Sequence, residues 1–143
     1  MDHVTIYSDG SCLGNPGRGG WAAVVQEDGA ESVLSGTEVN STNNRMELTA
    51  ALKALEAISG SSQVDFYTDS QYLRRGITEW LPGWRARGWK RKSGKLANVE
   101  LWQALEKAIR RHHIHWHWVK GHSTNKENQR VDKLAKEAML GMR

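Results

Sequence analysis

The sequence contains a single cysteine, Cys12, so no disulfide bond can form within the chain. It also lacks any apolar run that approaches the roughly 18 residues of a membrane span. The first residues, Met1-Asp2-His3-Val4, lack the basic and then apolar layout of a signal peptide. We therefore expect a cytoplasmic protein with no membrane partner.

The composition is typical of a globular, soluble protein. The 143 residues are 38% hydrophobic and 25% charged, which suits one domain over residues 1–143 with one core, and we expect a monomer. The net charge of +4 is unevenly distributed, because basic residues gather between Trp84 and Lys95 with no acid among them. They are Arg85, Arg87, Lys90, Arg91, Lys92 and Lys95. A basic segment on an otherwise slightly acidic chain indicates contact with a polyanion at one place.

The clearest amphipathic pattern predicts a helix from about Asn43 to near Ser59-Gly60. Its apolar residues recur at helical spacing, at Leu48, Ala51, Leu52, Leu55 and Ile58. Glu47 heads a line of otherwise apolar positions, so its carboxylate is predicted to be partly desolvated and to need a positive partner. The alternative is a first-turn acid that favours the helix dipole and faces water.

Five β-rich runs predict strands over residues 4–8, 21–26, 32–39, 64–68 and 114–120. Asp28-Gly29 predicts a hairpin between the second and third runs. Five glycines and Pro16 predict a turn-rich loop over residues 10–20. A short helix is expected over residues 70–76, followed by an apolar piece, Trp80-Leu81, that Pro82-Gly83 breaks.

Two further helices are predicted in the second half of the chain. Asn98 is a suitable N-cap for a helix that runs to about Arg111. The last helix, over residues 126–140, is expected to bury Val131, Leu134, Ala135, Ala138 and Met139. Together the elements predict an α/β fold with a mixed five-stranded sheet, three strands antiparallel and then two parallel. The helix near residues 43–59 makes the crossover, and helices cover both faces of the sheet.

Four acids are predicted to converge in this topology. Asp9 and Asp69 follow two strands that we expect to be parallel neighbours, so both side chains emerge at the same end of the sheet. Glu47 stands at the start of the crossover helix, and Asp132 heads an apolar line in the last helix. Carboxylates so close would repel one another, and divalent cations would relieve this. All-oxygen ligation suits Mg²⁺ or Mn²⁺ rather than zinc.

Each acid also has a simpler interpretation. Asp9-Gly10 is an ordinary turn dipeptide, Asp69-Ser70 is an ordinary helix N-cap, and Asp132 could be a solvated helix acid. The metal-site hypothesis therefore depends on their joint placement, and that placement depends on the inferred topology.

The residues resemble those of the type 1 ribonucleases H, cellular and retroviral, and most of all the bacterial single-domain members. Matching blocks run over nearly the whole chain in the order and spacing of that family. The blocks are YSDGSCLGNPGRGGWA (7–22), STNNRMELTAALKALEA (41–57), YTDSQYLRRGITEW (67–80), GWK (88–90), NVELW (98–102) and WVKGHSTNKENQRVDKLA (118–135).

The resemblance implies a Mg²⁺-dependent endonuclease, active with two ions, that cuts the RNA strand of an RNA–DNA hybrid and leaves 5′-phosphate and 3′-hydroxyl ends. Mn²⁺ could replace Mg²⁺. By position, Asp9, Glu47, Asp69 and Asp132 match the catalytic metal-binding acids. His122 matches a histidine on a mobile loop that assists proton transfer and product release; the alternative is a solvated loop residue.

The resemblance also implies how the substrate is held. Small polar groups near the acids meet ribose 2′-hydroxyls, and the matching residues are Cys12, Asn15, Asn43, Asn44 and Gln71. The Asn pair could instead only cap its helix. Thr42 and Asn98 match a pocket for a DNA-strand phosphate, but Asn40 stands where some members carry an arginine, which puts the strength of that pocket in doubt.

Further along the chain, a substrate-binding protrusion is implied at about residues 80–97. Its matching residues are Trp80, Trp84, Arg85, Arg87, Trp89 and Lys90. A tryptophan there could lie against deoxyribose while the basic side chains meet phosphates. Trp102, Trp116 and Trp118 are assigned to the core.

Two other functions remain open on the residues alone. One is a catalytically silent module that binds hybrids or duplexes, although such a binder has no use for clustered carboxylates. The other is a nuclease of the same fold that acts on another substrate, as transposases, integrases and junction resolvases do. A zinc pair at His115 and His117 is a third idea, but no third ligand is evident in the sequence.

Overall fold

The computed structural model describes residues 2–14, 16–89, 97–120 and 126–141. These residues form one mixed sheet with the strand order β3-β2-β1-β4-β5. The strands are β1 (Asp2–Gly14), β2 (Gly17–Glu27), β3 (Ala30–Ser41), β4 (Ser62–Thr68) and β5 (His113–Trp118). The β1–β2 and β2–β3 pairs are antiparallel, whereas β1–β4 and β4–β5 are parallel. The predicted α/β fold and its five-stranded mixed sheet are therefore confirmed.

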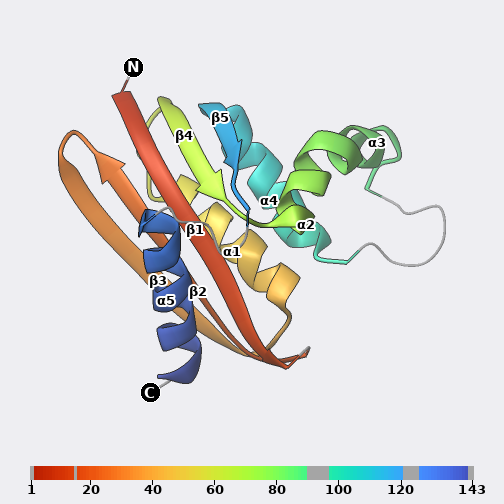
Figure 1. The fold of residues 1–143 in the computed structure, drawn as a ribbon. Helices are drawn as coiled ribbons and strands as arrows, with labels where there is room; N and C mark the ends of the chain where they lie inside the picture. Colours follow the sequence, from red (N-terminus) through yellow and green to blue (C-terminus); the bar gives the residue numbers. More distant parts are fainter. Residues whose placement is uncertain (1, 15, 90–96, 121–125, 142–143) are drawn as a thin grey trace.

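Helices cover both faces of this sheet, as predicted. They are α1 (Asn43–Glu56), α2 (Gln71–Arg75), a π-helical turn η1 (Gly76–Trp80), α3 (Leu81–Ala86), α4 (Val99–Arg110) and α5 (Lys126–Leu140). Figure 1 shows α5 in front of the sheet and alongside β1, with α1 and α4 behind the sheet, and α5 packs on β1, β2 and β3. None of the described helices is long and apolar enough to cross a membrane.

The main core lies between the sheet and the helices α1 and α4. Ile6 of β1 and Phe66 of β4 are fully buried there, against Leu48 and Leu55 of α1 and Trp102 of α4. Burying one such aliphatic or aromatic side chain stabilises a fold by about 1.5–3 kcal/mol. This core fixes α1 across the ends of β1 and β4, and so fixes the start of α1 beside those strands.

Helix α5 packs on the opposite face at an unusually close distance. A Cβ atom at Gly20 of β2 would lie 2.4 Å from the backbone nitrogen of Met139 and 2.6 Å from the carbonyl oxygen of Ala135. Only glycine permits this approach of helix backbone to strand backbone. Val131, Ala135 and Met139 are buried in the contact, but Leu134 and Ala138 are only half-buried, so the predicted burial of those two is wrong.

The predicted loop over residues 10–20 is also wrong, because β1 and β2 continue through most of it. Register pairs run from Val4–Glu27 to Gly14–Gly17, with Asp9 opposite Ala22. Gly10 serves close packing rather than a turn: a Cβ atom there would lie 2.5 Å from the backbone of Glu47. Asp9 is therefore a strand residue and not part of a turn. The hairpin at Asp28-Gly29 is confirmed, and both residues have positive φ, at 49° and 78°.

Residues 71–86 form a continuous helical segment where the sequence predicted a break at Pro82. Pro82 stands in the first turn of α3, directly after the π-helical turn η1, so the helical path continues past it. The π-helical turn before it contains Gly76, which lies against Trp102 of α4. The predicted N-cap of α4 is wrong in its mechanism: Asn98 has φ 57° and makes no capping hydrogen bond with its side chain.

Candidate active site

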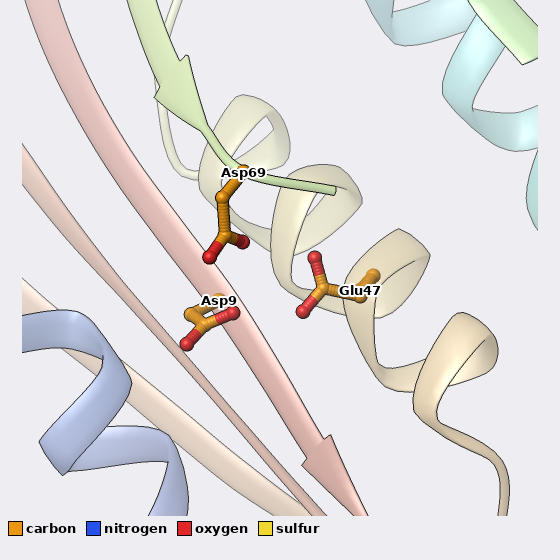
Figure 2. Close-up of side chains that lie close together, drawn as sticks. All are labelled: Asp9, Glu47 and Asp69. Atoms are coloured by element: carbon orange, nitrogen blue, oxygen red, sulfur yellow. The ribbon is translucent and has the colours of Figure 1, made fainter. Parts of the chain in front are cut away.

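Three carboxylates from three elements meet at one end of the sheet. Asp9 lies in β1, Glu47 in the second turn of α1, and Asp69 directly after β4. One oxygen from each residue lies within 4.8 Å of the others. Figure 2 shows the three side chains pointing toward one another. The parallel pairing of β1 and β4 brings two of them together, and the crossover helix brings the third.

Local hydrogen bonds hold this cluster in place. The backbone N–H of Gly10 donates to Glu47 Oε1 at 2.7 Å, which is possible because Gly10 has no side chain between β1 and α1. Ser70, and not Asp69, caps α2 by accepting from the N–H of Leu73 at 3.0 Å. The Asp69-Ser70 dipeptide is therefore a helix N-cap, as its simpler interpretation held, with Ser70 as the capping residue. The Asn43-Asn44 capping alternative is wrong, since Thr42 accepts from the N–H of Arg45 and caps α1.

The electrostatics of the cluster favour a bound cation. Asp9 and Glu47 are only 7% and 5% exposed. Burial, followed by the charge of Glu47, raises the pKa of Asp9 far above its ordinary value. Burial likewise raises the pKa of Glu47, although its hydrogen bond to Asp9 opposes this. Without a cation the pair is therefore stabilised by sharing a proton, and a divalent ion would compensate the full negative charge.

The donor set fits Mg²⁺ or Mn²⁺. All three groups offer hard carboxylate oxygens, and no thiolate or imidazole belongs to the described cluster. The predicted partial desolvation of Glu47 is confirmed.

Asp132 joins this site from α5, but less closely. Its side chain is 49% exposed and forms an ion pair with Lys136 at 3.1 Å, one helical turn later. A hydrogen bond with Asp132 is one of the causes that raise the pKa of Asp9, so the two carboxyl groups are in contact. The structure thus brings all four predicted acids to one place. Lys136 was missed by sequence reasoning, although its i, i+4 spacing from Asp132 was a usable signal.

A cleft of about 420 Å³ surrounds the acids. Three predicted substrate residues line it: Asn43 and Asn44 at the start of α1, and Gln71 at the start of α2. All three are exposed. Ser11 and Tyr72 also line the cleft and were not predicted. The described walls are mostly polar, so the cleft suits a hydrated, charged substrate better than an apolar one.

The other predicted groove residues lie beside this cleft. Cys12 is half-buried, and its thiol donates to the carbonyl oxygens of Gly17 and Ser41, both at 3.4 Å. Thr42 and Asn98 are bridged by Arg45: its N–H bonds to Thr42, and its Nη1 lies 3.5 Å from Asn98 Oδ1. The same guanidinium also pairs with Glu38 at 2.7 Å and Glu100 at 2.8 Å.

The tryptophans of the protrusion form a ring cluster over the core. Trp84 is only 7% exposed, with Trp80, Trp89 and Trp102 at centroid distances of 5.5, 6.3 and 5.4 Å. Its expected position on the substrate surface is therefore wrong, because its ring is enclosed by the others. Trp80 and Trp89 are half-buried and keep part of their surface open.

The cationic residues of the protrusion differ in their surroundings. Arg85 pairs with Glu106 of α4 at 2.8 Å, and Arg87 is exposed at the end of α3. Three predicted site residues, Asn15, Lys90 and His122, lie outside the described residues.

Comparisons with known proteins identify the family of this chain. Residues 1–140 match the family model described as RNase H. A ribonuclease H of Xanthomonas campestris pv. campestris (strain 8004) is 53% identical over 144 residues, covering 100% of this chain and 96% of that protein. A ribonuclease H of Agrobacterium fabrum is 54% identical over 140 residues, covering 97% and 96%.

Solved structures of ribonucleases H share the fold of this chain. The crystal structure of LC9-RNase H1, a type 1 RNase H with the type 2 active-site motif, has a TM-score of 0.90 and 36% identity, covering 100% of this chain and 74% of that one. LC11-RNase H1, solved in complex with RNA/DNA hybrid, shares the fold at a TM-score of 0.68 and 21% identity, covering 96% and 97%.

Proposed function

The chain belongs to the ribonuclease H family, and on that basis we propose that it hydrolyses the RNA strand of RNA–DNA hybrids in the cleft around Asp9, leaving 5′-phosphate and 3′-hydroxyl ends. The observation that carries the proposal is the cluster of Asp9, Glu47 and Asp69 at the sheet end. A module that only binds polyanions would be weakened by three carboxylates in its cleft. A hydrolase that holds divalent cations requires them.

In this proposal the acids are metal ligands. Asp9 and Asp69 would hold Mg²⁺ from the two parallel strands, Glu47 from α1 and Asp132 from α5. Two Mg²⁺ ions, when bound, clamp the attacking water and the leaving 3′-oxygen and lower the pKa of that water. Lys136 pairs with Oδ2 of Asp132, so the other oxygen of Asp132 would be the one that ligates. We propose His122 as the group that moves protons beside the acids.

The polar residues around the acids would select the RNA strand. Asn43, Asn44 and Gln71 line the cleft, where they would meet ribose 2′-hydroxyls, the groups that distinguish RNA from DNA. We assign the same role to Cys12 and Asn15. Cys12 already donates to two carbonyl oxygens, so its thiol can contribute only a weak contact or a groove wall.

A second set of residues would hold the DNA strand. We propose that Thr42 and Asn98 bind one of its phosphates, with Arg45 supplying the cation that Asn40 cannot. Glu38 and Glu100 already neutralise Arg45, so this pocket should be weak. Trp80 and Trp89 would lie against deoxyribose, while Arg87 and Lys90 would contact phosphates. We therefore propose that residues 1–143 form one catalytic domain with a substrate-binding protrusion at about residues 80–97.

The test is a strand-specific cleavage assay. End-labelled RNA–DNA hybrid, duplex RNA and duplex DNA are each incubated with the protein and Mg²⁺, beside an Asp9→Asn control. We expect cleavage of the RNA strand of the hybrid alone. Asp9→Asn should abolish it while hybrid binding, measured by fluorescence anisotropy, persists. Activity of Asp9→Asn within threefold of wild type would refute the assignment of Asp9, and binding without cleavage by wild type would favour a silent module.

A further inference from the structure

The sheet carries a second group of metal-ligating side chains, away from the acid cluster. Alternate residues of β5 are histidines, at 113, 115 and 117, while Ile114 and Trp116 between them pack against the main core. β5 is an edge strand. Helix α5 is on the same face of the sheet as these histidines, but it packs on β1, β2 and β3 rather than on β5 (Figure 1). The imidazoles are therefore open to solvent: His113 and His115 are exposed, and the His117 side chain is 39% exposed.

Asp65 of β4 supplies the third ligand that the sequence did not reveal. It is the register partner of His115, and its Oδ1 lies 2.8 Å from Nε2 of His117. Its other oxygen, Oδ2, lies 2.6 Å from Nε2 of His3 on β1. Both oxygens of Asp65 therefore face imidazoles, one from β5 and one from β1.

Ring stacking holds His117 in this orientation. Its imidazole lies parallel to the Tyr67 ring, with centroids 4.3 Å apart and planes inclined by 10°. Tyr67 in turn stacks on Tyr7 at 4.8 Å. The three rings form a row across β1, β4 and β5, so His117 loses little freedom when its Nε2 binds a ligand.

We propose that His115, His117 and Asp65 form a surface site for a transition-metal ion of the zinc class. Imidazole with one carboxylate suits Zn²⁺, Ni²⁺ or Cu²⁺, whereas the all-oxygen acid cluster suits Mg²⁺. His3 remains hydrogen-bonded to the second carboxylate oxygen of Asp65 and so orients that side chain, as the outer-shell partners of metal sites do.

Metal binding at this site requires a change of side-chain orientation, chiefly of His115. Side chains two residues apart on a strand have Cα atoms about 6.6 Å apart and share one face. Two ligand atoms bound at about 2.0–2.1 Å to a tetrahedral ion lie roughly 3.3 Å apart. The ion would replace the proton shared by His117 Nε2 and Asp65 Oδ1, which is released to solvent, and the N–O distance would lengthen from its 2.8 Å. His115, exposed and directly across from Asp65, must turn its ring toward the same point.

This site is separate from the proposed catalytic cleft. Tyr67 lies between Asp65 and Asp69 on β4, and none of the three ligands lines the cleft. Loss of the zinc-class site should therefore leave cleavage of hybrid with Mg²⁺ intact, so failure of either proposal is distinguishable from failure of the other.

Isothermal titration of Zn²⁺ into the full chain tests the proposal, with excess Mg²⁺ present to occupy the acid cluster. We expect one Zn²⁺ per chain, and at least about tenfold weaker binding for His117→Gln and Asp65→Asn, since even outer-shell changes commonly cost that much. His115→Gln alters an exposed position and keeps the test decisive if either other variant fails to fold.

His113→Gln is the matched control, since His113 is on the same strand and face but pairs in register with Gln63. It should bind Zn²⁺ as wild type does. The proposal is overturned if wild type binds no Zn²⁺, if His115→Gln binds it unchanged, or if His113→Gln loses as much affinity as His117→Gln.

Discussion

Asp9 is expected to affect both the proposed catalysis and the stability of this protein. Its pKa is raised by burial and by Glu47, so the folded protein binds a proton there more tightly than the unfolded chain. A raised carboxyl pKa contributes stability below the unfolded pKa, near 3.8, and that contribution is lost as the pH rises toward the folded pKa. Metal-free protein should therefore lose stability between about pH 4 and neutral pH.

Asp9→Asn should remove this loss. With EDTA present at pH 7.5 we expect its free energy of unfolding to exceed that of wild type by at least about 1.4 kcal/mol, the equivalent of one pKa unit. The difference should vanish near pH 4, and Mg²⁺ should stabilise wild type more than the variant. Urea unfolding at the two pH values measures this. Asp28→Asn, at an exposed turn, is the control, and an equal gain there would mean that net charge alone is responsible.

His122 is a residue whose role rests on its sequence position in the polar stretch ten residues before Asp132. His122→Ala should lower kcat by roughly 10²-fold, the usual range for a general acid–base group. KM should change little, because the residue is assigned to proton transfer or product release rather than to docking. Steady-state cleavage of hybrid measures both constants, with Ser123→Ala as the neighbouring control. A change confined to KM would show that His122 binds substrate instead.

At the scale of elements, periodic sequence patterns predicted well which helices and strands exist, but they predicted poorly the residues at which these elements begin and end. The alternation in β5 and the helical spacing in α1 and α5 reflect a face buried on a core, which local sequence encodes directly. Residues 10–14 and 17–20 were assigned to a loop because glycine is read as a turn former. In fact Gly10 and Gly20 are required by backbones that approach from α1 and α5, and no local signal shows an approaching element.

The same limit applies to side chains whose partners come from other elements. Asn98 has the residue type of an N-cap, yet its amide donates to the Tyr72 hydroxyl at 3.4 Å, a contact made across the fold. Trp84 was expected on the substrate surface, but three aromatic rings from three segments enclose it. Asp65, by contrast, had no motif at all and acquires a role only through the pairing of β4 with β1 and β5.

The contact between β2 and α5 yields a prediction at this scale. Gly20→Ala should destabilise the protein by about 1–3 kcal/mol, because the new methyl group would overlap backbone atoms of α5 that cannot rotate away. Since α5 carries Asp132, cleavage should fall as well.

Thermal unfolding and hybrid cleavage measure the two effects of Gly20→Ala. Gly83→Ala is the control: its Cβ would meet only the flexible Arg87 side chain at 3.3 Å, and alanine suits α3 better than glycine. Equal stability of the Gly20→Ala and wild-type proteins would show that the close packing of α5 is not required.

At the scale of the whole molecule, opposite charges are kept apart. The acids gather at the end of the central strands β1 and β4, whereas α3, which carries Arg85 and is followed by Arg87, lies beyond β5 (Figure 1). A phosphate backbone attracted to one place would be repelled from the other unless cations intervene. The arrangement therefore makes substrate attachment and metal-dependent chemistry separable, and the two should respond differently to salt.

Neutralising the protrusion should raise KM and flatten its dependence on salt. The variant changes Arg87, Lys90, Arg91 and Lys92 to Gln and keeps Arg85, whose charge already pairs with Glu106. Each lost phosphate contact lowers the log–log salt slope by about 0.9, so we expect a decrease of roughly one to three units, since not every charge need touch a phosphate. At saturating hybrid kcat should stay within a few-fold, because the acids lie elsewhere.

A control of equal charge distinguishes contact from general attraction. Lys53, Lys107, Arg110 and Arg111 lie at the last turns of α1 and α4, near the start of β5 and at the opposite end of the sheet from Asp69. Changing these four to Gln removes the same net charge without touching the proposed substrate path, so the salt slope should fall by less than about one unit. Equal decreases in the two variants would mean that the protrusion serves only as part of a diffuse positive field. A decrease limited to the protrusion variant would identify it as the place where the duplex backbone is held.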